Sequence, residues 1–487
     1  MSLLRSSTVQ KERKQIHMAS SSRRHRLIEI DWPEFGVAAC PLPPSTSELE
    51  ARIENLRAKM ERIKISHTVI YGDREHFANL AYLTGFDPRF EEALLIIGQT
   101  GTPLILVGNE CEAYLGISSL HSAGRMRHER FQSFSLLGQP RDRSRALREI
   151  LADEGIAQTA TVGAVGYKYF SNNEHPDAAH ALDIPAYIAD TLRELAGPDN
   201  VVNATDLLMH PAYGLRANCS PSEIAYFEYT NGQAAEAVKR MIFALREGMT
   251  DHSVVESSRL NGDPLSCHVT FVTGRNASYG LCGPSGELIR CGQPLAFNVS
   301  YWGSNICRAG WIARSAADLP DSASDYIPSF AGPYFEAMSQ WFGLMKLGTP
   351  GRSVYDLVQD LLPFDRFGIY LNPGHLIHLD EWMSSPFYPG SEIPVTSGMA
   401  IQVDVIPQSK KYFSTRMEDG IVIANVGLRT ELKESFPDCY TRCQRRRSFM
   451  NDVLGIELPE EVLPLSNTCA IVPPFFLSPN TVIALET

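Results

Sequence analysis

The sequence lacks the marks of several large classes of protein. Its ten cysteines include no CxxC pair and no spacing typical of zinc ligands, which argues against the common zinc-binding modules. No apolar run approaches the length of a membrane span, and the first residues lack the apolar segment of a signal peptide. Acidic residues outnumber basic ones by 56 to 44, which argues against nucleic acid as a partner. We therefore expect a cytoplasmic protein with reduced thiols that binds neither membranes nor nucleic acid.

What the chain does have is the composition of a globular protein, with 44% hydrophobic and 21% charged residues. Its 487 residues exceed what one ordinary hydrophobic core organises, so we expect two domains. Residues 1–45 are polar and then rich in proline, and they predict a poorly ordered arm or a strap over another surface. We place the first domain at 46–210 and the second at 211–487, the latter with a carboxyl-terminal extension.

In the first domain, predicted strands alternate with predicted helices. Leu49, Ile53 and Leu56 recur at helical spacing and predict an amphipathic helix over residues 48–65. Buried strands are predicted from apolar runs at 67–71, 93–97, 103–107 and 160–167. This alternation is typical of a compact α/β domain.

The second domain opens with a long helix and then changes to strands. The helix is predicted from Pro221 to Phe243, with Ser220 or Ser222 as its cap. Runs rich in β-forming residues follow at 268–274, 294–303, 309–316, 375–382, 399–407 and 420–426, with a helical interlude at 324–363. This pattern predicts a curved, mainly antiparallel sheet flanked by helices, so the fold class is α+β.

One stretch, LNPGHLIHLDEW at 371–382, concentrates ionisable side chains behind a Pro-Gly turn. Two further carboxylates, Asp404 and Glu418, follow it in or beside apolar strands. An unpaired carboxylate would be costly there, so Asp404 needs His375, Arg416 or a cationic substrate group as its partner. A structural ion pair with Arg416 is the alternative role for Glu418.

His375 is the main candidate for catalysis. The turn before it would aim its ring into a cleft, and neighbouring carboxylates would raise its pKa so that it could shuttle protons near neutral pH. A hydrogen-bonded core histidine is the alternative. His378 and Asp380 alternate by two, so a strand would point both to one face, either as an acid–base dyad or as a polar face. Glu381 is expected to be solvated or to serve as a structural anchor.

Five phrases occur in the order found in a known family: NLAYLTGF at 79–86, PSEIAYF at 221–227, PGH at 373–375, GMAIQVDVIP at 398–407 and RMEDGIVIA at 416–424. From about residue 48 to residue 430, the chain resembles the creatinase and aminopeptidase P family, peptidase family M24. The resemblance implies a pita-bread carboxyl-terminal domain preceded by a creatinase-type α/β domain. It also implies a homodimer.

The metallopeptidases of this family hold two metal ions with two Asp, one His and two Glu side chains. The resemblance places His375 at the His and Asp404 and Glu418 at the two Glu positions. Asn298 stands at the first Asp position and Ala309, eleven residues later, at the second. Because two anionic ligands are missing, we expect no bound metal. A single metal on His375, Asp404 and Glu418 is the alternative left open.

Further residues are candidates for binding the substrate. Asn298 can donate to and accept from a substrate amide. The family's other catalytic His falls near Cys282, with His268 one strand earlier, so His268 or His375 could serve Cys282 as a base. A small buried residue is the alternative for Cys282.

The resemblance adds three more positions. Trp382 stands where metallopeptidases place a His, seven residues after the first one. In creatinase-like dimers, an aromatic residue and an Arg from the partner's first domain bind a substrate carboxylate. Arg89 and Phe90 stand in nearly that place.

Creatinase works without metal, and it too looks to have Asn and Ala at the two Asp positions. The resemblance therefore implies a metal-independent, hydrolase-like enzyme that acts on a C–N bond of a small nitrogen-containing metabolite. His375 would shuttle protons while Asp404 and Glu418 grip a cationic group. One alternative is an Xaa-Pro aminopeptidase-like enzyme with a degenerate or mononuclear metal site. Another is a binding protein without catalysis, like the amino-terminal domain of a histone-chaperone subunit.

Overall fold

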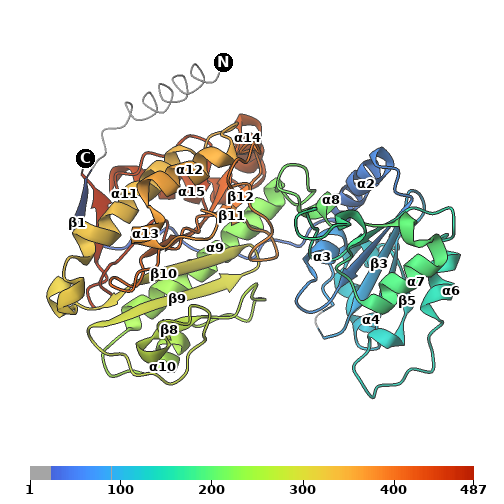
Figure 1. Ribbon diagram of the computed structural model, residues 1–487, viewed down its shortest axis with the longest axis horizontal. Helices are drawn as coiled ribbons and strands as arrows, with labels where there is room; N and C mark the ends of the chain where they lie inside the picture. Colours follow the sequence, from blue (N-terminus) through green and yellow to red (C-terminus); the bar gives the residue numbers. More distant parts are fainter. Residues whose placement is uncertain (1–23, 89, 487) are drawn as a thin grey trace.

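The computed structural model describes residues 24–88 and 90–486, which form two units that lie side by side (Figure 1). A six-stranded sheet organises the amino-terminal unit, and two four-stranded sheets organise the carboxyl-terminal unit. This mixture of strands and helices agrees with the expected α+β class. None of the helices in the described ranges is long and apolar enough to cross a membrane.

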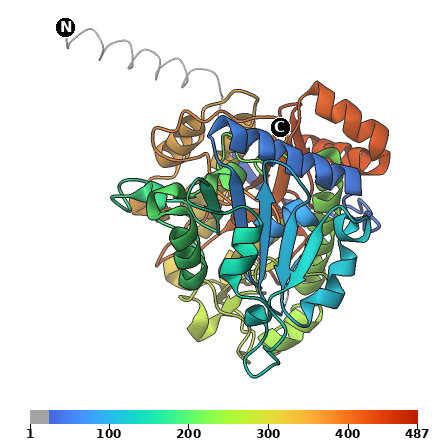
Figure 2. The same cartoon turned by 90° about the vertical axis from the view of Figure 1, so that its right-hand side faces the viewer.

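The sheet of the amino-terminal unit is mixed, with the strand order β5-β4-β3-β2-β6-β7. Its strands are β2 (His67–Gly72), β3 (Ala93–Gly98), β4 (Leu104–Val107), β5 (Arg127–Arg130), β6 (Val162–Val165) and β7 (Val201–Asn203). Its helices are α2 (Thr46–Arg62), α3 (Ala78–Thr84), α4 (Cys111–Tyr114), α5 (Ser119–Ser122), α6 (Leu147–Asp153), α7 (Ala186–Ala196) and α8 (Asp206–Met209). Figure 2 looks onto this unit and shows the strands at its centre with helices around them.

Strand β3 explains why the sheet reads as a continuous apolar run in the sequence. Leu94 and Ile96 belong to one hydrophobic cluster, whereas Leu95 and Ile97 belong to another. Successive side chains of a strand point to opposite faces, so both faces of this sheet are buried. The predicted strands at 67–71, 93–97 and 103–107 are confirmed.

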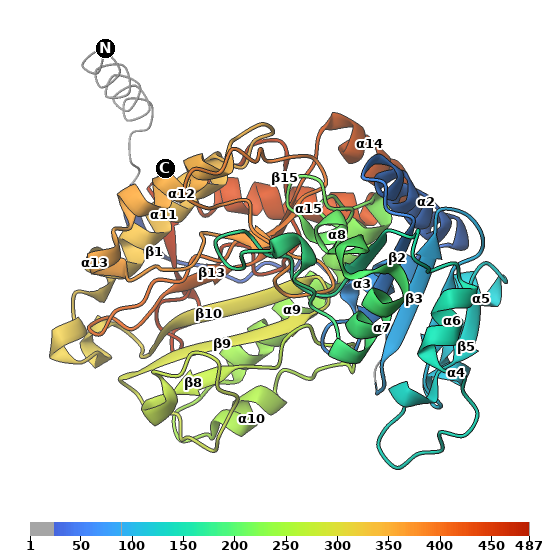
Figure 3. The same cartoon turned by 45° about the vertical axis from the view of Figure 1, so that its right-hand side comes forward.

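The carboxyl-terminal unit contains two antiparallel sheets, ordered β13-β10-β9-β8 and β11-β12-β14-β15. Its strands are β8 (Phe271–Thr273), β9 (Gln293–Tyr301), β10 (Ser304–Ile312), β11 (His375–Leu376), β12 (Ala400–Gln402), β13 (Arg416–Glu418), β14 (Gly420–Ile423) and β15 (Val462–Pro464). Its helices are α9 (Pro221–Ala244), α10 (Asp251–Glu256), α11 (Gly332–Gly343), α12 (Gly351–Leu361), α13 (Phe364–Phe367), α14 (Val426–Ser435) and α15 (Pro437–Asp452). Figure 3 shows β9 and β10 as a long hairpin, and α9 packs against both strands.

The predicted long helix is confirmed as α9. The Ser220 side chain accepts a hydrogen bond from the backbone N–H of Glu223, and the Glu223 carboxylate accepts one from the backbone N–H of Ser220, which forms a capping box. The predicted strand at 375–382 is wrong beyond its first two residues. After Leu376 the chain turns, because the N–H of His378 donates to the carbonyl of Asp380 at 3.1 Å. His378 and Asp380 therefore do not share a strand face.

The described part of the amino-terminal arm forms a strap over the carboxyl-terminal unit. Strand β1 (His25–Glu29) pairs antiparallel with β16 (Thr481–Leu485) near the other end of the chain. Beyond it, Trp32 and Phe35 are buried. The Trp32 indole N–H donates to the carbonyl of Pro479 at 2.9 Å, and its ring meets Phe243 edge-on at 5.5 Å. Residues 1–23 of the predicted arm lie outside the described residues, and the domain boundaries stay a prediction.

Replacing Trp32 by Ala tests how firmly the strap is held. The variant loses a buried ring and a buried hydrogen bond, so we expect the free energy of unfolding to fall by about 3–5 kcal/mol. Urea denaturation followed by circular dichroism measures this change. Val37→Ala is the matched control from the same segment, since Val37 is 47% exposed. Equal stability of the two variants would contradict the conclusion that Trp32 holds the strap on the carboxyl-terminal unit.

Candidate active site

Three neighbouring strands bring Asn298, Cys307 and Glu418 into one row. In the antiparallel register, Cys307 of β10 lies opposite Asn298 of β9 and opposite Glu418 of β13. Directly opposed residues point to the same face of a sheet. In the next row, Ala309 lies opposite Ala296 and Arg416. These two rows form the floor of the site.

His375 reaches the site from β11 in the second sheet. The Pro-Gly turn before it is present, with Gly374 at a φ of 108° that favours glycine. The ring is fully buried, and its Nε2 lies 3.5 Å from Oε1 of Glu381 and 3.9 Å from Oδ2 of Asp404. Trp382 stacks on the same ring, with centroids 4.0 Å apart. Hence His375 faces carboxylates on one side and is covered by Trp382.

Glu381, Asp404 and Glu418 together form what we term the carboxylate cluster, and Asn305 links its members. The side-chain amide of Asn305 donates to Glu418 at 2.7 Å and to Glu381 at 3.2 Å. Its carbonyl oxygen accepts from Asn298 at 3.0 Å. The predicted site residues Asn298, Asp404 and Glu418 are thus brought together with His375. The expectation that Glu381 is solvated is wrong, because it lies in the cluster.

Burial governs the protonation of these groups. It raises the pKa of Glu418 well above the usual range, and the neighbouring Asp404 and Cys307 raise it further. It also raises the pKa of Asp404 and of Glu381. Burial lowers the pKa of His375, against the pull of Asp404. The expected rise in the His375 pKa is therefore wrong, because loss of hydration outweighs the carboxylates.

Ala309 lies in an apolar environment. Ala309 packs with Val272 and Ala296, and Cys282 and Phe413 pack against them. We term these five residues the apolar cluster. Arg416 lies beside it, and its Nη1 donates to the sulfur of Cys307 at 3.1 Å. A guanidinium and apolar side chains thus occupy this half of the site.

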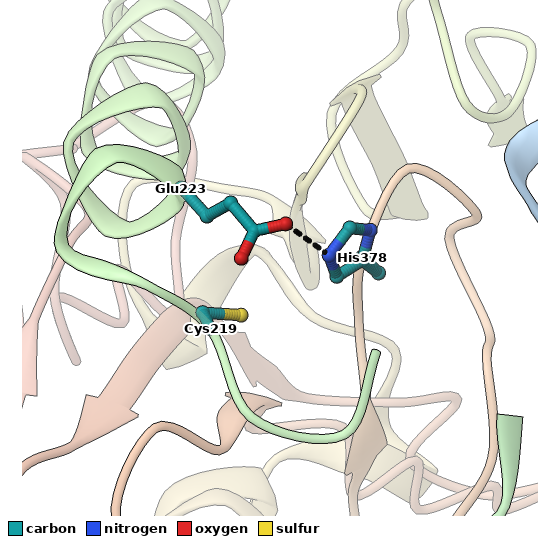
Figure 4. A group of neighbouring side chains, drawn as sticks. All are labelled: Cys219, Glu223 and His378. Carbon is teal, nitrogen blue, oxygen red and sulfur yellow. Dashed lines mark hydrogen bonds and ion pairs between the residues drawn. The ribbon is translucent and has the colours of Figure 1, made fainter. Parts of the chain in front are cut away.

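His378 and Asp380 have partners away from His375. His378 donates from Nε2 to Glu223 at 3.0 Å, and Figure 4 shows the ring turned toward Glu223 with Cys219 beside them. Cys219, Glu223 and His378 have the composition of a metal site. However, Nη2 of Arg52 already lies 3.0 Å from Glu223. Although burial opposes it, the hydrogen bond from His378 helps to lower the pKa of Glu223 to about 2. The cluster is therefore satisfied by a guanidinium.

Asp380 forms a buried ion pair with Arg216, which also donates to Asn79 at 2.7 Å. A third link joins the hydroxyl of Tyr167 to the carbonyl of Trp382 at 3.3 Å. The segment 377–382, which we term the anchored loop, is therefore held by Tyr167 of the amino-terminal unit, by Arg216, and by Glu223 of α9. The predicted dyad of His378 and Asp380 is not formed, since each side chain has a different partner.

Of the other predicted substrate-binding residues, only Trp382 contacts His375 in the described part of the chain. His268 is exposed, and its Nε2 donates to the carbonyl of Leu281 at 2.8 Å. Cys282 lies in the apolar cluster but is only half-buried, so the alternative of a small buried residue is met in part. Phe90 is 70% exposed, and Arg89 lies outside the described residues. Trp382 does touch His375, but as a stacked ring.

Sequence reasoning missed Asn305 and Cys307 as parts of the site, although a signal for them was present. Both precede Ala309 by an even number of residues on the same strand, so the period of two places all three side chains on one face. Counting back from Ala309 would have found them. No pattern in the sequence indicates the contact between Glu381 and His375, because this contact depends on the turn after Leu376.

A cavity of about 520 Å³ lies beyond Trp382, between the two units. Its walls include Tyr167, Tyr169, His210, Trp382 and Tyr388. Burial, together with the charges of Asp380 and Glu381, raises the pKa of Tyr167 to about 12. The cavity thus adjoins the anchored loop, and Trp382 separates it from His375.

No family model matches the chain, and no curated protein matches its sequence. Solved structures do. The dipeptidase PepE from Mycobacterium ulcerans is 17% identical, with 79% of this chain and 95% of that one covered and a TM-score of 0.58. The prolidase from Thermococcus sibiricus is 14% identical, with 86% and 96% covered and a TM-score of 0.60. The amino-terminal domain of the FACT complex subunit SPT16 from chickpea, Cicer arietinum, is 15% identical, with 78% and 95% covered and a TM-score of 0.56.

The chain has the pita-bread fold. The predicted fold class is thereby confirmed over most of the length. At these identities the likeness establishes the fold, and chemistry has to be argued from the residues of the site.

Replacing Arg216 by Met tests the structural role of Asp380. The Arg216 side chain is fully buried and that of Asp380 is 8% exposed, so the variant leaves a buried carboxylate without its cation. We expect the free energy of unfolding to fall by about 3–5 kcal/mol. Arg148→Met is the matched control, because it breaks an exposed pair with Glu194. Urea denaturation measures the free energy of unfolding. A loss of stability no larger than that of the control would contradict the conclusion that Arg216 holds the anchored loop through Asp380.

Glu418→Gln tests the protonation of the carboxylate cluster. A carboxyl whose pKa is raised by folding contributes stability at low pH that is lost as the pH rises through its folded pKa. Removing this group should therefore make the unliganded protein more stable than wild type at about pH 8. The stability of the variant should also fall less steeply than that of wild type as the pH rises from acid values. Thermal unfolding at a series of pH values measures this. Glu194→Gln, at an exposed site, should leave the pH profile unchanged, and a destabilised Glu418→Gln variant at alkaline pH would show the pKa direction to be wrong.

Proposed function

We propose that the site around His375 belongs to a metal-independent, hydrolase-like enzyme that binds a small cationic nitrogen compound and cleaves one of its C–N bonds. The observation that carries this proposal is the carboxylate cluster around Nε2 of His375, in which burial raises the pKa of all three members. Buried carboxylates in such numbers favour a bound cation, because a positive charge offsets the hydration that they lost. An amidinium or guanidinium group offers that charge together with several N–H donors.

The other half of the site supports a mechanism without metal ions. Two metal ions require several anionic ligands, and Asn298 and Ala309 supply none. Arg416 places a fixed positive charge opposite Ala309, and Asp404 and Glu418 lie close enough to raise its pKa. The guanidinium thus carries part of the charge balance that the second metal would provide in a dinuclear enzyme.

His375 is suited to move the proton in this reaction. Burial keeps its pKa low, so the ring is neutral near pH 7 and can accept a proton at Nε2. Its Nδ1 lies 3.2 Å from the carbonyl of Leu376, a contact that favours a proton on Nδ1 and leaves Nε2 as the acceptor. Trp382 fixes the plane of the ring by stacking on it. The protonated ring would then give its proton to the leaving nitrogen.

A second candidate is a mononuclear metal-dependent peptidase, and one observation favours it. His375, Glu381 and Glu418 offer ligand atoms that all lie within 4.8 Å of one another. These donors fit a divalent cation, so Glu381 would replace Asp404 in the predicted ligand set. Such an ion would polarise a carbonyl and activate water. Dipeptidases and prolidases are among the proteins of the same fold. A homodimer remains a prediction for either candidate.

Ligand binding distinguishes a guanidinium from its neutral isostere. We expect millimolar methylguanidinium to raise the melting temperature and methylurea to leave it unchanged, since only the former is a cation. The effect should weaken as the pH falls, because protons compete for the carboxylate cluster. The double variant Glu381→Gln, Asp404→Asn should abolish the effect, whereas Glu194→Gln should retain it. Differential scanning fluorimetry measures all of these shifts.

The reaction itself is tested by release of amine or ammonia from a panel of guanidino and amidino compounds. Turnover in chelator-treated protein should be lost in His375→Gln while the fold is retained. Elemental analysis of protein purified without chelator should show less than one equivalent of metal per chain. One full equivalent, with turnover of an Xaa-Pro dipeptide that chelator removes, would establish the second candidate instead.

A further inference from the structure

We infer that the sulfur of Cys307 is the nucleophile of the site around His375, an inference that rests on the proposed function. Cys307 occupies the middle of the row formed by β9, β10 and β13, between Asn298 and Glu418. It is 3% exposed and lies on the face that carries the carboxylate Glu418. A substrate cation held by the carboxylate cluster would therefore present its central carbon above this row.

Arg416 lies beside this cysteine. Its Nη1 donates to the sulfur at 3.1 Å, so a fixed positive charge is held against the atom that would attack the substrate. The partner across the strand is Ala309, and Glu418 and Asp404 are the carboxylates close enough to act on the guanidinium. Nε of Arg416 is buried without a hydrogen-bond partner among residues 24–88 and 90–486. The geometry thus directs the cation to the sulfur.

Two buried polar atoms mark where a ligand fits. Nε2 of His375 and Oδ1 of Asp404 have no hydrogen-bond partner in the described part of the chain. His375 is fully buried and Asp404 is 5% exposed, and Nε2 of His375 lies 3.9 Å from Oδ2, the other carboxylate oxygen of Asp404. Buried polar groups are normally satisfied, so a ligand with N–H donors would complete both. In this arrangement, Cys307 as nucleophile, His375 as proton shuttle and the carboxylate cluster as the cation-binding group belong to one site.

The neighbouring cysteines lack this arrangement. Cys282 packs against the apolar cluster. Cys267 is half-buried beside Asn298, and no guanidinium contacts it among the described residues. Cys40 is exposed. Cys307 is thus distinguished by its contact with Arg416.

The reaction balances with His375 as the only proton carrier. The Cys307 sulfur attacks the amidinium carbon and forms a C–S bond while the thiol proton passes to His375. The C–N bond to the leaving amine then breaks, and the amine nitrogen takes that proton. Water attacks the same carbon and gives a proton to His375. Finally the C–S bond breaks, the sulfur recovers that proton, and the amide or urea product loses its excess proton to the released amine.

Two electrophiles of nearly equal shape test the inference. We expect 2-chloroacetamidine, a cation, to alkylate Cys307 of the full-length protein about tenfold faster than neutral 2-chloroacetamide, because the cation is held by the carboxylate cluster. Peptide mapping by mass spectrometry locates the modification. Cys40 serves as the internal reference and should show no comparable preference. Arg416→Met should slow alkylation of Cys307 and leave that of Cys40 unchanged.

The outcomes separate this inference from the proposed function. Absence of alkylation at Cys307 while Cys40 reacts would overturn the assignment of Cys307 as the nucleophile. Equal rates for both reagents at Cys307 would support its assignment as the nucleophile and contradict the proposal that the substrate is a cation. With an identified substrate, Cys307→Ser should lose turnover whereas Cys267→Ser keeps it. Full turnover in Cys307→Ser, lost again in His375→Gln, would leave the proposed function standing without Cys307.

Discussion

The site depends on the cost of burying charge. Three carboxylates meet beside a fully buried histidine, and none of these groups can ionise there as freely as in water. The fold supports this arrangement through three strands of one sheet and one of the other, whose backbones are fixed by their own ladders. Side-chain amides of Asn298 and Asn305 supply hydrogen bonds without adding charge. The cluster is therefore held in a state that a bound cation would relieve.

The same constraint explains the opposite half of the site. The space at Ala309 is filled by apolar side chains and bordered by Arg416. This half of the site therefore holds a fixed positive charge, whereas the other half holds carboxylates. A carboxylate introduced at Ala309 would lie beside a cation that the fold already provides.

Much of this could be predicted from the sequence, and the failures share a cause. The strands at 67–71 and 93–97, the long helix α9, and the meeting of His375, Asp404 and Glu418 all follow from local pattern and from the order of five phrases. Glu381 could not be placed, because its contact depends on a turn closed by one backbone hydrogen bond after Leu376. The partners of His378 lie more than 150 residues away in the chain, where no local pattern reports them. The predicted direction of the His375 pKa shift was wrong, because the burial of a side chain cannot be inferred from its neighbours in the sequence.

The anchored loop makes the geometry of the proposed site a property of both halves of the molecule. Glu381 and Trp382 approach His375 from a segment that is tied to Glu223, Arg216 and Tyr167. A change in how the two units dock would be transmitted to Glu381 and Trp382 without altering any residue that touches a ligand. The ligand preference of the proposed site could thus change through substitutions at the seam between the units, and sequence comparison confined to the pita-bread domain would overlook them.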